Sequence, residues 1–125
     1  MNYNVHLIAL LLILPLVSAA NLQVEQVEKN GIILTEYNNN ATFKLQITNN
    51  EERSDEFQIY SLVSVTIYPK ELFIIEEGST ITLDITAIPS REILKDRRGI
   101  YAFEYQIKGK NTGYFKDNLA IKILE

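Results

Sequence analysis

Short runs rich in Ile, Val, Thr, Tyr and Phe recur about every ten residues along most of this chain. Asn, Gly, Pro and acidic residues separate them, and this pattern is typical of antiparallel β-sheets. The clearest run is 42–47, in which Phe43, Leu45 and Ile47 alternate with Thr, Lys and Gln. Because successive side chains of a strand point to opposite faces, these three residues are expected to face a core.

The same reasoning predicts the remaining strands. They are 22–27 with 32–34, 56–60, 63–67, 72–75, 81–87, 101–107 and 119–123. Asn30 and Gly31 divide the first of these, so it should be one strand in two parts. Pro69 and Pro89 should end two others, since proline cannot donate to a ladder. We therefore predict an all-β fold, an immunoglobulin-like antiparallel β-sandwich of about seven to eight strands.

One segment departs from the strand pattern. Residues 90–99 could form a helical turn, with Ser90 as the N-cap, and Ile93 and Leu94 should cover one end of the core. Gly99 and Tyr101 follow at a spacing that suggests a tyrosine corner, in which the hydroxyl bonds back to the preceding corner. A purely apolar role for this Tyr is the alternative. Residues 108–118 are expected to form a loop before the last strand.

The first twenty residues predict export. An apolar run from Leu7 to Val17 precedes Ser18, Ala19 and Ala20, and small residues are what a signal peptidase reads. The run is shorter than the 20 or so residues that a membrane-spanning helix needs. We therefore expect cleavage between Ala20 and Asn21, no stable membrane insertion afterwards, and a secreted or cell-surface domain at 21–125. The lack of Lys or Arg at the start departs from the usual leader pattern.

The composition restricts the chemistry of the mature domain. The only His and the only Met are His6 and Met1, both in the leader, and the chain has no Cys and no Trp. This excludes Ser-His-Asp and Cys-His catalysis, as well as zinc, haem and blue-copper ligand sets, from residues 21–125. The formal net charge of -4 argues against a nucleic-acid partner. We expect no cofactor and no enzyme activity; a small carboxylate-dependent hydrolase is the least favoured alternative.

Four stretches carry candidate sites. Asn40 begins an Asn-Ala-Thr glycosylation acceptor, whose alternative is an ordinary turn. Acidic residues at 51–56 and 76–77 offer oxygen ligands for calcium, although solvated acidic loops are the favoured interpretation. Residues 108–113 resemble a phosphate loop only in composition, and a hairpin is favoured. Tyr114 and Phe115 are two aromatics at a predicted loop tip, suited to anchoring a partner or to capping the core.

Several packing and turn motifs support a family resemblance. They are residues 42–51, Ile67-Tyr68-Pro69, Glu77-Gly78-Ser79 and residues 99–103. Together they resemble the secreted immunoglobulin-like domains of archaeal and bacterial surface proteins, of the CARDB and NPCBM-associated type. That resemblance implies a stalk, spacer or adhesion module rather than a catalyst.

The function expected from the sequence is therefore an exported, non-catalytic interaction or structural module, whose partner is a protein or a surface glycan. The main alternative is a domain that binds a carbohydrate or inhibits a protease through loop aromatics around Tyr114.

Overall fold

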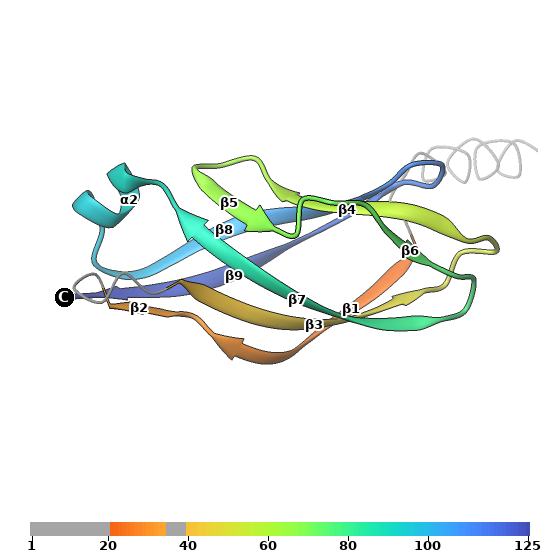
Figure 1. Cartoon of the computed structure of the whole chain (residues 1–125), viewed down its shortest axis with the longest axis horizontal. Coiled ribbons are helices and arrows are strands. Elements are labelled where there is room, and N and C mark those ends of the chain that lie inside the picture. Colours follow the sequence, from red (N-terminus) through yellow and green to blue (C-terminus); the bar gives the residue numbers. More distant parts are fainter. Residues whose placement is uncertain (1–20, 35–39) are drawn as a thin grey trace, which may run out of the picture.

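The chain forms a sandwich of two β-sheets (Figure 1). The computed structural model describes residues 21–34 and 40–125, and within them lie nine strands and one helix. The elements are β1 Leu22–Asn30, β2 Ile32–Leu34, β3 Ala41–Asn49, β4 Asp55–Ser61, β5 Val65–Tyr68, β6 Phe73–Ile75, β7 Thr80–Pro89, α2 Arg91–Asp96, β8 Gly99–Gly109 and β9 Tyr114–Leu124. The predicted all-β sandwich is confirmed. The predicted signal peptide, including Ala20, lies outside the described residues.

The first predicted strand divides between the two sheets. The four-stranded sheet has the order β1-β3-β7-β5, and the five-stranded sheet has the order β2-β9-β8-β4-β6. Residues 22–30 pair antiparallel with β3, whereas residues 32–34 pair parallel with β9. At Gly31 an added Cβ would meet the backbone oxygen of Ala120 at 2.9 Å. The chain can therefore cross between the sheets here only because glycine has no side chain.

The core lies between the sheets and follows the predicted alternation. Phe43, Leu45 and Ile47 of β3 are buried, as expected. The long strands of the other sheet contribute Phe103, Tyr105, Ile107, Leu119, Ile121 and Ile123. Ile81 and Leu83 are partly buried against this cluster, and Ile85 and Ala87 complete the row. Burial of this apolar surface is the main contribution to stability in a chain without disulfides.

Helix α2 closes one end of the sandwich, at the end where the chain terminates (Figure 1). Ser90 caps it as predicted, since its side chain accepts a hydrogen bond from the Ile93 backbone N–H at 3.4 Å. Ile93 is buried and Leu94 packs against the core. The β8–β9 hairpin lies at the opposite end of the molecule.

Two local predictions are wrong. Residues 108–118 are not a loop, because β8 runs to Gly109 and β9 begins at Tyr114, which leaves a connection of only four residues. The acidic stretch 51–56 is not wholly solvated either, because Asp55 is the first residue of β4 and is only 4% exposed.

Candidate functional site

The β8–β9 hairpin is held in place by the carboxylate of Asp55. This carboxylate accepts hydrogen bonds from the backbone N–H groups of Asn111 and Thr112, at 3.0 and 2.9 Å, and from their side chains, at 3.2 and 2.7 Å. The N–H of Glu56 adds a fifth donor at 2.8 Å. Asp55 therefore joins the start of β4 to the tip of a hairpin more than fifty residues away in the sequence. Tight turns commonly bind carboxylates through such converging N–H groups.

The same contacts determine the ionisation of Asp55. Burial raises the pKa of its carboxyl group, but the hydrogen bonds from Thr112, Asn111 and Glu56 favour the charged form more strongly. The net result is a pKa below the ordinary value of 3.8. Asp55 is therefore a buried, charged group at neutral pH, and its role is to bind the hairpin.

Gly109 makes this approach possible. An added Cβ at this position would collide with the Thr112 hydroxyl and would lie 2.6 Å from Asp55 Oδ2. The Gly109 N–H also closes the turn by donating to the Gly113 carbonyl at 2.8 Å. Any larger residue would push Thr112 away from the carboxylate.

The two candidate aromatics lie on opposite faces of β9. Tyr114 points outward and is 44% exposed. Phe115 points inward and contacts the Tyr105 ring, with centroids 6.3 Å apart. They are the first two residues of a strand rather than a loop tip, so the predicted placement is wrong. Of these two aromatic residues, only Tyr114 has a ring that a partner could contact, whereas Phe115 packs against the core.

An apolar edge adjoins this hairpin on the outer face of the five-stranded sheet. Leu72 and Ile74 are 55% and 63% exposed, and Ile74 belongs to β6, the last strand of that sheet. A hollow of about 390 Å³ lies beside them. Its lining is Glu56, Gln58, Leu72, Lys108, Gly109 and Lys110. We call the outward residues Glu56, Gln58, Leu72, Ile74, Lys108, Lys110 and Tyr114 the hairpin-end surface.

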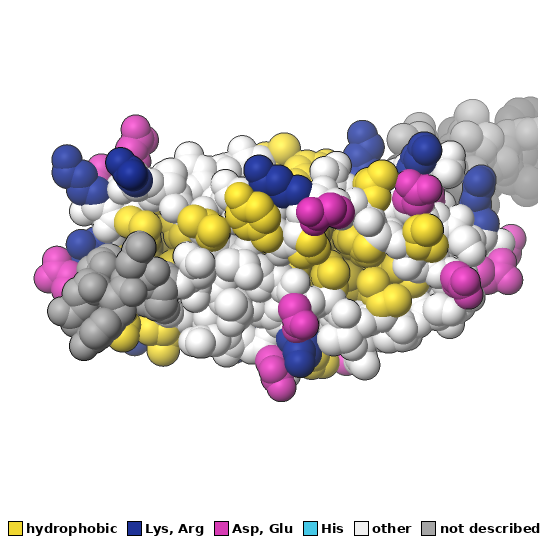
Figure 2. Space-filling view, viewed as in Figure 1, with side chains coloured by type: hydrophobic (Ala, Val, Ile, Leu, Met, Phe, Trp, Pro, Cys, Tyr) yellow, Lys and Arg dark blue, Asp and Glu magenta, His cyan; other side chains and the backbone are white. Residues whose placement is uncertain are grey.

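The register places these residues on one face. Tyr114 is opposite Lys108 across β8 and β9, and Lys108 is opposite Gln58 across β8 and β4. Glu56 is opposite Ile74 across β4 and β6. On the side of the molecule seen in Figure 2, hydrophobic side chains form a broken band along the long axis, with acidic and basic side chains around it. Exposed apolar residues are thus not confined to the hairpin end, but at that end Leu72 lies beside Lys108 and Lys110.

Sequence reasoning missed Leu72 and Ile74 as surface residues. The run 72–75 is apolar throughout, so its pattern did not show which side chains face outward. The available signal was the position of the run between Pro69 and an acidic turn, which is typical of a short edge strand.

Asn49 joins β6 to the other sheet. It is completely buried, and its side-chain amide donates to the carbonyls of Arg53 and Ile75 at 3.0 and 2.9 Å. Its Oδ1 accepts from the Glu51 N–H at 2.9 Å. All three interactions of the side chain are therefore internal, and they hold the short edge strand in place.

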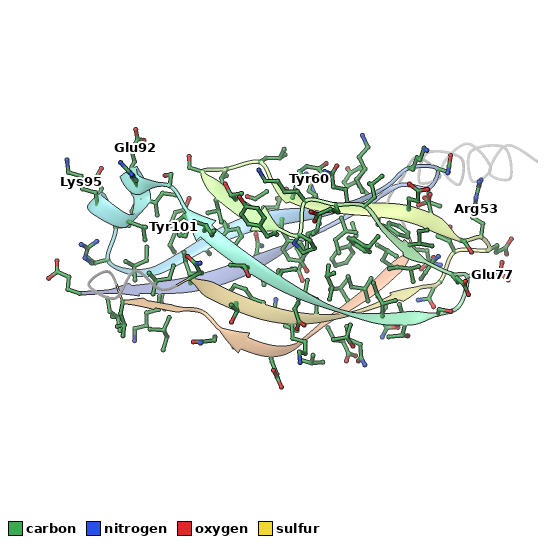
Figure 3. The ribbon with its side chains drawn as sticks, viewed as in Figure 1. Arg53, Tyr60, Glu77, Glu92, Lys95 and Tyr101 are labelled. Atoms are coloured by element: carbon green, nitrogen blue, oxygen red, sulfur yellow. The ribbon has the colours of Figure 1, made fainter. Side chains whose placement is uncertain are left out.

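The remaining predicted residues lie away from this surface. Asn40 is exposed just before β3, and its glycosylation stays a prediction. Tyr101 is partly buried; its ring contacts Phe103 and lies under the guanidinium of Arg97, 5.9 Å from the centroid. Figure 3 shows Tyr101 in the half of the molecule that carries α2. Gly99 has a positive φ of 87°, as a turn before a strand requires. The corner hydrogen bond of Tyr101 stays a prediction.

Residues 21–34 and 40–125 contain no group of three or more acidic, His or Cys side chains arranged to hold a metal ion. Among the same residues, no helix has the length and apolar character needed to cross a membrane.

Comparison with solved structures places the fold. The chain is similar to a FixG-related protein from Vibrio parahaemolyticus, with a TM-score of 0.62 at 17% identity over 87% of this chain and 100% of that one. It is also similar to the ASH/PapD-like domain 7 of human CEP192, with a TM-score of 0.52 at 14% identity over 86% and 87% of the two chains.

A protein of unknown function from Porphyromonas gingivalis W83 gives a TM-score of 0.52 at 16% identity, over 82% of this chain and 46% of that one. The fold is an immunoglobulin-like antiparallel β-sandwich, and the CEP192 domain similar to it is described as PapD-like. No family model and no curated protein matches the sequence, so the CARDB or NPCBM-associated type stays a prediction.

Proposed function

We propose that this protein is an exported, non-catalytic immunoglobulin-like domain that binds another protein through the hairpin-end surface. The observation that carries the proposal is the exposure of Leu72 and Ile74 at the edge strand β6. Natural proteins usually protect sheet edges with charges or bulges, because an open edge pairs with other chains. The edge strand β1 has both a register shift and several charges, whereas β6 presents aliphatic side chains. Because β6 has only three residues, the exposed side chains of Leu72 and Ile74, and not its backbone edge, favour a protein partner.

The non-catalytic part of the proposal is supported by composition. Residues 21–125 contain no His and no Cys, so a nucleophile would need a Lys or a carboxylate as its base. The most strongly shifted carboxylate, Asp55, is fully engaged by five donors of its own chain. A group in that position is suited to structure rather than to proton transfer.

Export is supported by the position of Asn21. Its backbone N–H donates to Glu51 Oε1 at 2.7 Å, and its carbonyl accepts from the Asn50 N–H at 2.9 Å. Cleavage after Ala20 would leave a positively charged amino group beside this carboxylate, so the new amino terminus would have an ion-pair partner. Sequencing of the amino terminus of the secreted protein tests this, and a mature chain that retains Met1 would contradict it.

The binding proposal is tested by capture of partners from surface extracts of the source cells, with proteins identified by mass spectrometry. Leu72→Ser with Ile74→Ser should abolish capture. The matched control is Val27→Ser with Leu62→Ser, because these side chains are also aliphatic and are 45% and 72% exposed elsewhere on the molecule. Equal capture by both double variants would show that the hairpin-end surface is not the contact. Capture that survives protease treatment of the extract but not glycosidase treatment would favour the glycan alternative.

A further inference from the structure

The outer face of the five-stranded sheet carries lysines without ion-pair partners. Lys108, Lys116 and Lys122 are exposed on this face, and Lys110 follows β8 at its end. Two carboxylates, Glu56 and Glu104, share the face. The ion pairs among the described residues involve Lys44 and Arg98 only, so none of these four lysines is neutralised there. Four lysines against two carboxylates leave this face with an excess of positive charge, in a chain whose formal net charge is -4. It creates a local positive potential on an acidic protein.

The outer face of the four-stranded sheet is different. Its Lys44 lies between Glu28 and Asp84, with Nζ to oxygen distances of 3.7 and 3.8 Å. The neighbouring outward positions carry Thr or Gln, apart from Glu25. The charges around Lys44 are therefore partly paired within the chain, whereas the lysines of the other face are free to contact a charged partner.

Aliphatic side chains accompany the lysines at both ends of that face. At the hairpin end Leu72 lies beside Lys108 and Lys110. At the other end Ile100 is 77% exposed, and it lines a hollow of about 310 Å³ together with Lys122 and Ala120. Lys116 lies between them on β9, six positions before Lys122, which corresponds to about 20 Å along a strand. The face thus offers two apolar contacts, each beside lysines, with Lys116 and Glu104 between them.

We propose that this face binds an acidic protein segment, whose carboxylates contact Lys108, Lys116 and Lys122 and whose aliphatic residues fill the two hollows. This inference rests on the proposed function and names the chemical class of the partner. Lysines attract any polyanion, but Leu72, Ile74 and Ile100 favour a polypeptide, because sugars are bound mainly by aromatic platforms and amides. The exposed aromatic ring of the hairpin-end surface is Tyr114 alone. An anionic polysaccharide is therefore the competing occupant, and the experiment separates the two.

The probe is a fluorescently labelled ten-residue peptide of alternating Glu and Val, titrated with the full mature domain and followed by anisotropy. Its control has Gln in place of every Glu. We expect binding of the Glu peptide only, and weakening as salt rises from about 0.1 to 1 M, where the screening length falls from about 10 to 3 Å. The triple variant Lys108→Gln, Lys116→Gln and Lys122→Gln should bind about tenfold more weakly, because each exposed pair contributes modestly.

The control triple variant is Arg53→Gln, Arg91→Gln and Lys95→Gln. It removes the same charge from residues outside the strands of this face, and Figure 3 shows Arg53 and Lys95 at the two ends of the molecule. These three side chains are exposed, so the control should fold and bind the peptide within about twofold of the parent. Equal weakening by both triple variants would overturn the proposal, since the effect would then come from net charge alone.

Two other results would also overturn it. Lysine-dependent binding of polygalacturonate without binding of the Glu peptide would assign the face to an anionic polysaccharide. Lysine-dependent dimers in sedimentation, without peptide binding, would assign it to a second copy of this chain. Failure of the inference is separable from failure of the proposed function, because partner capture can still depend on Leu72 and Ile74 when the acidic peptide does not bind.

Discussion

Replacing Asp55 by Asn tests the contact that positions the hairpin. The substitution preserves shape but replaces one acceptor oxygen by an NH₂ group, which would face the donors of Asn111, Thr112 and Glu56. Five donors now converge on the carboxylate, and hydrogen bonds to a charged group contribute about 1.5 to 3 kcal/mol each when taken singly. These values do not add within a network. We expect Asp55→Asn to lower the free energy of unfolding by about 1 to 3 kcal/mol at pH 7, the cost of leaving a buried donor without its acceptor.

The pH dependence of this loss has a definite sign. The pKa of Asp55 in the folded chain lies below its ordinary value of 3.8. At acidic pH the Asp55 carboxyl group is therefore protonated to a smaller extent in the folded chain than in the unfolded chain. Its stabilisation is therefore complete above the unfolded pKa and decreases as the pH falls through the folded pKa. Asn does not titrate. The difference in stability between the parent and Asp55→Asn should therefore be constant near neutrality and should shrink below about pH 4.

Urea denaturation of both proteins between pH 7 and pH 2.5 measures this difference. Thr112→Val is the companion variant, because it removes only the hydroxyl donor at 2.7 Å and should cost about 1 to 2 kcal/mol. In the double variant the two losses should not add, since both act on one network. Two results would refute the conclusion that the Asp55 carboxylate holds the β8–β9 hairpin in place. One is a loss of unfolding free energy below about 1 kcal/mol for Asp55→Asn at pH 7, and the other is a stability difference between parent and variant that does not change with pH.

Three further substitutions test neighbouring parts of the structure by the same denaturation assay. Gly109→Ala should destabilise the domain by about 1 to 3 kcal/mol, because the new methyl would displace Thr112 from Asp55, and parental stability would exclude this close approach. Tyr105→Phe should leave the free energy of unfolding unchanged or raise it by up to about 1 kcal/mol, because the buried Tyr105 hydroxyl has no hydrogen-bond partner among the described residues. A clear loss of stability would show that the hydroxyl does have such a partner. Phe103→Ala should cost about 3 to 5 kcal/mol, a large part of the roughly 5 to 15 kcal/mol that stabilises a domain, and a parental denaturation curve would place Phe103 outside the core.

The strands that the sequence predicted well are those with one buried and one solvated face. In β3, β8 and the end of β9, burial alternates with a period of two, so Phe43, Phe103 and Ile121 could be assigned inward from the pattern alone. Ser90 was predictable for a similar reason, because helix capping is a local interaction. The sheet to which each strand belongs could not be predicted from the pattern, since strand pairing is set by contacts between residues that are distant in the sequence.

The start of β9 shows why the last loop was predicted too long. Lys116, Asp117 and Asn118 are all exposed, so no alternation marks this part of the strand in the sequence. The strand exists there because its backbone pairs with β8 from Tyr114 onward. Exposed strands of this kind have no hydrophobic signal and are recognised only from their ladder partner.

The candidate site was harder to predict than the fold because its parts are far apart in the chain. Asp55 looked like one of several acidic loop residues, and nothing in its neighbourhood indicates that Asn111 and Thr112 bind it. The lysines likewise belong to two strands and a turn, and only the β8–β9 register brings Lys108 and Lys116 to the same face. Sequence reasoning identified Tyr114, but it could not show that Phe115 points the other way.

Peptide binding could weaken in acid for two separable reasons, because both the Asp55 contact to the hairpin and the proposed acidic partner depend on charged carboxylates. Below about pH 4 a partner's own carboxylates become neutral. At lower pH, below the lowered pKa of Asp55, the hairpin that carries Lys110 also loses its anchor. In Asp55→Asn the second process no longer titrates, so the remaining pH dependence of peptide binding belongs to the partner alone. A Glu peptide that binds the parent and this variant with the same acid profile would show that the Asp55 contact to the hairpin serves the fold and not the binding face.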